Sequence, residues 1–132
     1  MTQGIRYARD LLSSAKSHVT RGEYDVASFE ARQAALSALS AVAASGSGGV
    51  REAYERAIAS GLPRDPSLLL CAALLDSLEL VNLERCEDAC VDELPAAEAL
   101  SWSDLEDATR AVGCAERLLE HVTRYLGTRS AQ

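Results

Sequence analysis

The sequence lacks several features that mark particular classes of protein. It has no run of about 18 consecutive apolar residues, so we expect no segment to cross a membrane. Residues 1–20 contain no uninterrupted apolar core of a signal peptide, which predicts a cytoplasmic location. The sequence signatures of phosphate-binding loops, hydrolase nucleophile elbows and zinc proteases are all absent. No stretch alternates apolar and polar residues with a period of two, so we expect no strands.

Charge of one sign dominates only one part of the chain. The net charge is −7, but nine acidic residues and one basic residue lie between Glu84 and Asp107, and the remainder is close to neutral. A broad affinity for DNA is therefore not expected. A local basic surface is still compatible with this composition, because charges act over only about 8 to 10 Å in salt near the physiological concentration. Lysine is nearly absent and arginine supplies the cations, which suits bidentate contacts with phosphate or carboxylate and is equally explained by genomic base composition.

Cysteine is present but in no metal-binding pattern. The four cysteines are Cys71, Cys86, Cys90 and Cys114. Cys86 and Cys90 are spaced for one helix face, yet no second pair with ligand spacing follows. We therefore assign no metal and expect no cofactor. In a cytoplasmic protein such cysteines are expected to be small buried hydrophobic residues, with a disulfide expected mainly in a hyperthermophile.

Apolar residues recur at steps of three and four along most of the chain, which is typical of helices. The expected helices cover approximately residues 4–20, 24–45, 50–59, 68–81 and 104–127. Glycines are expected to end two of them, at Gly22 and Gly61. The pattern predicts an all-α fold, an antiparallel up-and-down bundle of four to five helices, formed by residues 1–132 as a single domain.

Two of these segments have distinctive surfaces. The helix at 24–45 is rich in alanine and places its bulky residues, among them Phe29 and Leu39, on one face. A helix of this kind packs between close neighbours, so we expect it to be central. The segment 68–81 is apolar around most of its circumference. We expect it to form the interface of a homodimer, because a small monomer has little core to bury it in.

The run YDVASFEARQAALSALSAVAASG, residues 24–46, resembles the signature helix of the HEPN domain family. The matching positions are Gly22, Tyr24, Asp25, Phe29, Gln33, Ala34 and Ala35. Further along, Arg85 and Asp88 match the ends of a turn that the family often has, and the two middle residues differ here. The segment WSDLEDATRAVGCAERLLEHV is similar to the final helix of the family. The resemblance spans residues 5–126.

The resemblance implies a small helical bundle that usually dimerises. Such domains often act with a minimal nucleotidyltransferase as their partner, and some are toxin ribonucleases. The ribonucleases use an arginine and a histidine separated by four to six residues, and a partner enzyme silences related toxins by nucleotidylating a nearby tyrosine. These properties are expectations that follow from the family and not from the spacing of residues alone.

The stretch RLLEHVTRY, residues 117–125, carries the nearest equivalent of that pair. Arg117, His121 and Tyr125 are spaced by four and project from one side of a helix. Only three residues separate Arg117 from His121, so the standard ribonuclease motif is absent and we favour a protein that is not an enzyme. The alternative is a metal-independent, toxin-type endoribonuclease of a toxin–antitoxin pair. In it, Arg117 would stabilise the phosphorane, His121 would act as acid and base, and Tyr125 would be the modification site.

A column of arginines on the same helix suggests a phosphate-bearing ligand. The candidate nucleotide or phosphate contacts are Arg110, Arg117, Arg124 and Tyr125. The competing interpretation is a solvated face with ion pairs, because Glu106 precedes Arg110 by four residues and Glu120 precedes Arg124 by four. The sequence favours a non-catalytic HEPN-like module that binds a minimal nucleotidyltransferase or a nucleotide, with RNA as a further candidate ligand.

Overall fold

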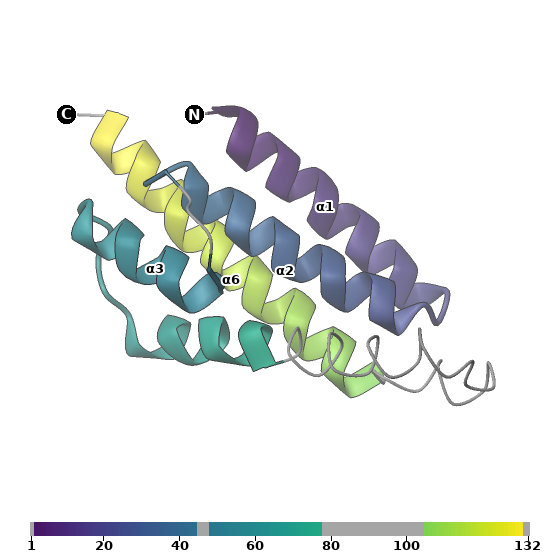
Figure 1. Ribbon diagram of the computed structural model, residues 1–132. Coiled ribbons are helices and arrows are strands. Elements are labelled where there is room, and N and C mark those ends of the chain that lie inside the picture. Colours follow the sequence, from purple (N-terminus) through teal and green to yellow (C-terminus); the bar gives the residue numbers. More distant parts are fainter. Residues whose placement is uncertain (1, 45–47, 78–104, 131–132) are drawn as a thin grey trace.

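The computed structural model describes residues 2–44, 48–77 and 105–130, which form helices joined by turns (Figure 1). The helices are α1 (Thr2–Thr20), α2 (Tyr24–Ser40), α3 (Val50–Ala59), a helix over residues 66–77 that we call the 66–77 helix, and α6 (Leu105–Ser130). The described residues contain no strand, and the predicted all-α fold is confirmed. Within these residues, no helix combines the length and the apolar character needed to span a bilayer.

Helix α2 is the centre of the bundle. It contacts α1, α3 and α6, and α1 runs antiparallel to both α2 and α6 (Figure 1). The side chains that α2 buries completely are mostly alanines: Ala27, Ala31, Ala34, Ala35 and Ala38. Small side chains let neighbouring helix backbones approach closely. The predicted central position of this helix is therefore confirmed.

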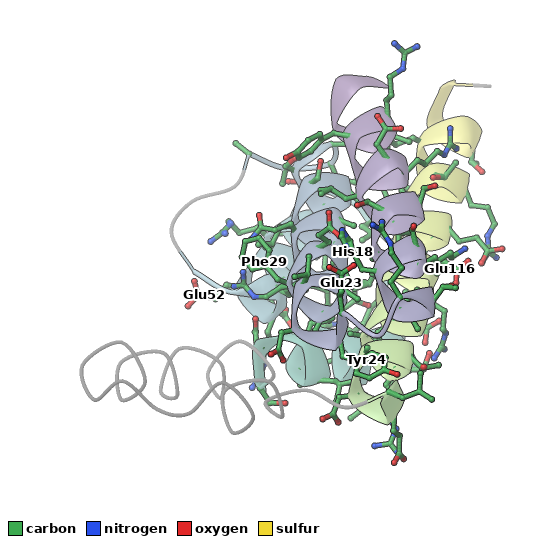
Figure 2. The ribbon with its side chains drawn as sticks, turned by 90° about the vertical axis from the view of Figure 1, so that its right-hand side faces the viewer. His18, Glu23, Tyr24, Phe29, Glu52 and Glu116 are labelled. Carbon is green, nitrogen blue, oxygen red and sulfur yellow. The ribbon has the colours of Figure 1, made fainter. Side chains whose placement is uncertain are left out.

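The prediction that the bulky residues of α2 share one buried face is wrong in part. Leu39 is buried, but Phe29 is 59% exposed and lies on the outer side of the helix (Figure 2). The alanine faces receive α1 and α6, so the large aromatic ring is left on the solvent side. Helix α2 also ends at Ser40, before the predicted end near residue 45, because the amides of Ala41 and Val42 bond to carbonyls three residues back and tighten the last turn.

Glycines end two helices as predicted. Gly22 adopts a φ of 78°, and the amide of Glu23 donates to the carbonyl oxygen of His18 at 2.8 Å, which closes the end of α1. Gly61 adopts a φ of 120°, and the amide of Leu62 donates to the carbonyl oxygen of Ala57 at 3.0 Å at the end of α3. A left-handed backbone of this kind favours glycine, because it carries no Cβ.

The first two helices are joined by a polar cluster around His18 (Figure 2). The Nδ1 atom of His18 lies 3.0 Å from Oε1 of Glu23, and its Nε2 atom lies 3.3 Å from Oε1 of Glu30. The hydroxyl of Ser14 donates to Glu30 at 2.8 Å. The hydrogen bond from His18 lowers the pKa of Glu23 below its ordinary value. This histidine therefore serves to connect α1 with α2.

Several sequence predictions fall outside the described residues. The end of the predicted helix 68–81, the acidic stretch up to residue 104, Cys86, Cys90 and the similarity of Arg85 and Asp88 to a family turn all lie there. Within the described part of the chain, no three potential metal ligands come together.

Candidate functional site

Helix α6 places Arg117, His121 and Tyr125 on one side, as their spacing predicts, and this side faces the chain between α3 and the 66–77 helix. The Nη2 atom of Arg117 donates to the hydroxyl of Ser67 at 2.7 Å. The Nε2 atom of His121 lies 2.8 Å from the carbonyl oxygen of Pro63, which can only accept, so this nitrogen carries the hydrogen. The side chains of Arg117 and His121 thus lie against other parts of the bundle.

Tyr125 packs against the end of α3. A Cβ atom added to Gly61 would lie only 2.6 Å from the phenolic oxygen of Tyr125. The glycine therefore serves two purposes, because it adopts a positive φ and leaves room for the hydroxyl. Tyr125 is half-buried in this position. The residue that the sequence suggests for nucleotidylation is consequently covered on one side by the protein's own backbone.

The turn before the 66–77 helix is held by two sets of hydrogen bonds. One oxygen of Asp65 accepts from the amide of Ser67 at 3.0 Å and from its hydroxyl at 2.8 Å. The buried hydroxyl of Tyr54 donates to the carbonyl oxygen of Asp65 at 3.0 Å and accepts from its amide at 2.8 Å. Pro66 stands in the first turn of the helix, where it needs no hydrogen-bond acceptor.

The electrostatics of this turn involve the same α6 residues. Hydrogen bonds from Ser67 are the main cause that lowers the pKa of Asp65; burial opposes them, and electrostatic interactions with His121 and Arg117 lower the pKa by smaller amounts. A charged carboxylate is thereby favoured beside the Arg117–His121 pair. In the sequence, Asp65 and Ser67 are distinctive only as the start of a helix.

A groove of about 450 Å³ lies between the 66–77 helix and α6. Its lining is formed by Ser67, Leu70, Cys71, Leu74, Arg110, Gly113, Cys114 and Arg117. Leu70 is 73% exposed, so the groove has an apolar wall that is open to solvent. Two arginines of the predicted basic column meet this wall. A volume of this size is in the range of small-molecule sites in proteins.

The two arginines in the groove differ in their partners. Arg110 forms an ion pair with Glu106, as the four-residue spacing predicts. Arg117 contacts neutral groups, the hydroxyl of Ser67 and, at 3.7 Å, the sulfur of Cys71. Among the residues that the structure describes, no carboxylate lies within ion-pair distance of Arg117. Its charge acts on the carboxylate of Asp65 from beyond ion-pair distance, and its guanidinium forms no ion pair with the described residues.

Arg124 belongs to a different surface. It lines a second groove, of about 440 Å³, which contains Arg9 of α1 and also Glu116, Leu119, Glu120 and Thr123 of α6. Arginines seven residues apart drift around a straight helix by about 20° per step, which turns the column from the 66–77 helix toward α1. The predicted Glu120–Arg124 ion pair is not formed among the described residues. The three candidate arginines thus divide between two grooves, and Tyr125 lines neither of them.

Two cysteines share the first groove. Cys71 of the 66–77 helix is buried, and Cys114 of α6 is half-buried. Burial is the main cause that raises the pKa of Cys114 to about 12, and a hydrogen bond between the two side chains adds to it. At neutral pH Cys114 is therefore a thiol, with Cys71 in contact and Arg117 beside the pair. Nothing in the sequence pattern joins these two positions.

Known proteins share this sequence pattern and this fold. The family model of the HEPN domain matches residues 1–125. TT1696 from Thermus thermophilus superposes with a TM-score of 0.75 at 24% identity, over 93% of this chain and 95% of that one. ST0689, described as an archaeal HEPN homologue, superposes with a TM-score of 0.67 at 21% identity, over 94% and 95%. At such identities the two structures show a shared fold.

Among curated proteins, no relative matches the chain. The family model, in contrast, extends from residue 1 to Tyr125 near the end of α6, and so reaches every helix of the described bundle. It also includes the alanine-rich α2, where the resemblance in sequence is strongest. The chain belongs to the HEPN domain family.

Proposed function

We propose that this HEPN domain protein is a non-catalytic module that binds a nucleotide in the groove between the 66–77 helix and α6. The observation that carries the proposal is the position of Arg117, whose guanidinium forms no ion pair in the described part of the chain and lies beside the apolar wall of Leu70 and Leu74. A guanidinium suits a phosphate and an apolar wall suits the face of a base. Arg110 stands at the same groove as a second cation.

The contacts of His121 support a structural role for this residue. General acid–base catalysis needs an imidazole nitrogen within reach of the substrate. Here the Nε2 atom of His121 donates to the carbonyl oxygen of Pro63 at 2.8 Å, and the Arg117 guanidinium bonds to Ser67. Both side chains therefore help to dock the 61–67 turn on α6. The spacing of only three residues between Arg117 and His121, shorter than in the ribonuclease motif of the family, also supports a structural role.

The test is calorimetric titration of the purified protein with ATP and, separately, with adenosine. Arg117→Gln is expected to weaken ATP binding roughly ten- to a hundredfold, because a hydrogen bond to a charged group contributes about 1.5–3 kcal/mol. Adenosine binding, which involves no phosphate, should change little. Arg124→Gln is the matched control, since it removes the same charge from the other groove. Equal loss in both variants, or no binding by the wild type, would refute the proposal.

The second candidate function is the metal-independent endoribonuclease. One observation favours it: Arg117 and His121 both contact the segment 63–67, and both act on the carboxylate of Asp65, so the pair is spatially close. Cleavage of RNA by the wild type in the presence of EDTA, lost in His121→Ala, would establish this activity. The binding proposal instead expects no cleavage by either protein, with the nucleotide affinity of His121→Ala still measurable.

Homodimerisation and a minimal nucleotidyltransferase partner also stay proposals. The exposed side chain of Leu70, at 73%, lies on the helix for which the sequence predicts the dimer interface, and this supports the dimer. Light scattering coupled to size exclusion should give the mass of a dimer for the wild type and of a monomer for Leu70→Glu. Co-expression with a candidate nucleotidyltransferase, followed by purification through one tagged chain, would test the partner.

A further inference from the structure

The thiol pair of the groove, Cys71 and Cys114, joins two helices that are distant in sequence. Cys71 comes from the 66–77 helix and Cys114 from α6, and both line the groove. Cys71 is 3% exposed, while Cys114 is half-buried. The two side chains act on each other, since Cys71 contributes to the raised pKa of Cys114. In neither the proposed binding mode nor the ribonuclease alternative does a thiol have a role.

Cys71 and Cys114 are placed so that a disulfide can form between them. A disulfide requires two cysteines whose side chains already face each other, because the sulfur–sulfur bond is short and its geometry is specific. The sulfur of Cys71 faces the turn of α6 that carries Cys114, because it accepts a hydrogen bond from Arg117, three residues after Cys114, at 3.7 Å. Arg117 adds a positive charge at 3.7 Å from the sulfur of Cys71, which attracts a thiolate formed in the pair. Oxidants can enter from the groove.

We propose that Cys71 and Cys114 are a reversible oxidation site, at which an intramolecular disulfide forms and ties the 66–77 helix to α6. The proposal concerns the protein's own sulfurs and holds whether or not the groove binds a nucleotide. It differs from the sequence-based expectation that the cysteines act as buried hydrophobic residues, because it depends on a contact between residues 43 positions apart.

The reaction is a thiol–disulfide exchange with a low-molecular-weight disulfide such as oxidised glutathione. Cys114, the more exposed residue, loses its proton to solvent and its thiolate attacks one sulfur of the small disulfide, which releases one small thiolate. The thiolate of Cys71 then attacks the sulfur of Cys114 in the mixed disulfide and releases the second. The protein loses two electrons and two protons, and the small disulfide is reduced to two thiols.

The environment of Cys114 predicts the pH dependence of this reaction. With a pKa of about 12, Cys114 is almost entirely a thiol at neutral pH. As long as the pH is below this pKa, each increase of one pH unit raises the thiolate fraction about tenfold. The first step should therefore accelerate about tenfold between pH 7 and pH 8. The closed protein should also unfold at a temperature about 10 °C higher, because the bond constrains a long loop in the unfolded chain.

The experiment uses the full chain with Cys86→Ser and Cys90→Ser, which leaves only the proposed pair. The protein is incubated with oxidised glutathione, its remaining thiols are alkylated, and its intact mass is measured. We expect the loss of two hydrogens with no alkylated cysteine, and full recovery of both thiols after reduction. Cys71→Ser in the same background is the matched control, because it keeps the more exposed Cys114, and it should give only a mixed disulfide with glutathione.

Peptide mapping of the oxidised wild type keeps the test independent of the stability of these variants. A linked peptide that contains Cys71 and Cys114 supports the proposal. A folded protein whose two thiols both stay free, or carry glutathione on each sulfur, would overturn it. Linkage of either residue to Cys86 or Cys90 alone would overturn it equally, because it would mean that the two groove cysteines are not each other's partners.

Discussion

Asp76, near the described end of the 66–77 helix, holds the beginning of α3 from a position 26 residues away in the sequence. One carboxylate oxygen accepts from the amide of Val50 at 2.7 Å and the other from the amide of Arg51 at 3.0 Å. The guanidinium of Arg32 on α2 lies 4.0 Å from the same carboxylate. One side chain therefore connects three helices, and it does so at the positive end of the α3 dipole.

Replacing Asp76 by alanine should be strongly destabilising. Loss of a helix-capping side chain costs about 1 kcal/mol, and hydrogen bonds to a charged group contribute about 1.5–3 kcal/mol. We therefore expect Asp76→Ala to lower the free energy of unfolding by about 2–4 kcal/mol, where small domains have about 5–15 kcal/mol in total. The Arg32 side chain, only 8% exposed, would also lose a neighbouring negative charge. The midpoint of thermal unfolding should fall by about 10 °C.

The measurement is urea denaturation followed by circular dichroism. Asp76→Asn keeps the shape and one acceptor oxygen, so its loss should be intermediate. Asp10→Ala, which removes an exposed carboxylate on α1, is the control and should stay within about 0.5 kcal/mol of the wild type. If Asp76→Ala also stayed within that range, Asp76 would not be the capping group of α3 and this reasoning would be refuted.

Three other perturbations test the 61–67 turn. Gly61→Ala combines a strained positive φ with an overlap on the hydroxyl of Tyr125, so the free energy of unfolding should fall by about 1–3 kcal/mol in urea denaturation, and less in the Tyr125→Phe background. Tyr54→Phe leaves the amide of Asp65 without its acceptor and should cost about 1–3 kcal/mol by the same assay. The pKa of Asp65 is lowered by folding, so its stabilising effect is present above the unfolded pKa of about 4 and is lost as the pH falls through the folded value. The stability advantage of the wild type over Asp65→Asn, measured by denaturation from pH 7 downward, should accordingly shrink in acid; an advantage that stays constant would contradict this assignment.

Much of the fold could be predicted because helices are encoded locally. The apolar steps in α1 and α6 and the glycines at positions 22 and 61 depend on neighbours within a few residues, and these predictions hold. Phe29 was misplaced because periodicity identifies bulky residues but not which face the neighbouring helices choose. In α2 close packing on alanine outweighed burial of the aromatic ring. The tertiary structure, and not the local sequence, determines which face of α2 is buried.

Of the candidate site, only the arrangement of residues along a single helix could be predicted from the sequence. The shared side of Arg117, His121 and Tyr125 follows from their spacing on one helix. Their contacts do not, because Pro63 lies 58 residues from His121 and Ser67 lies 50 residues from Arg117. The contact of Cys71 with Cys114 is hidden for the same reason. Helix geometry is encoded in a single segment, whereas the groove exists only after two segments have docked.

The alanines of α2 have a consequence for the entropy of folding. An alanine has no side-chain rotamers to lose, so ordering the centre of this bundle costs almost no side-chain entropy. The same residues bury little apolar area each, so the hydrophobic gain per residue is small as well. A centre built in this way has few alternative packings to sample. We expect its native state to stay well ordered on heating until the helices separate together.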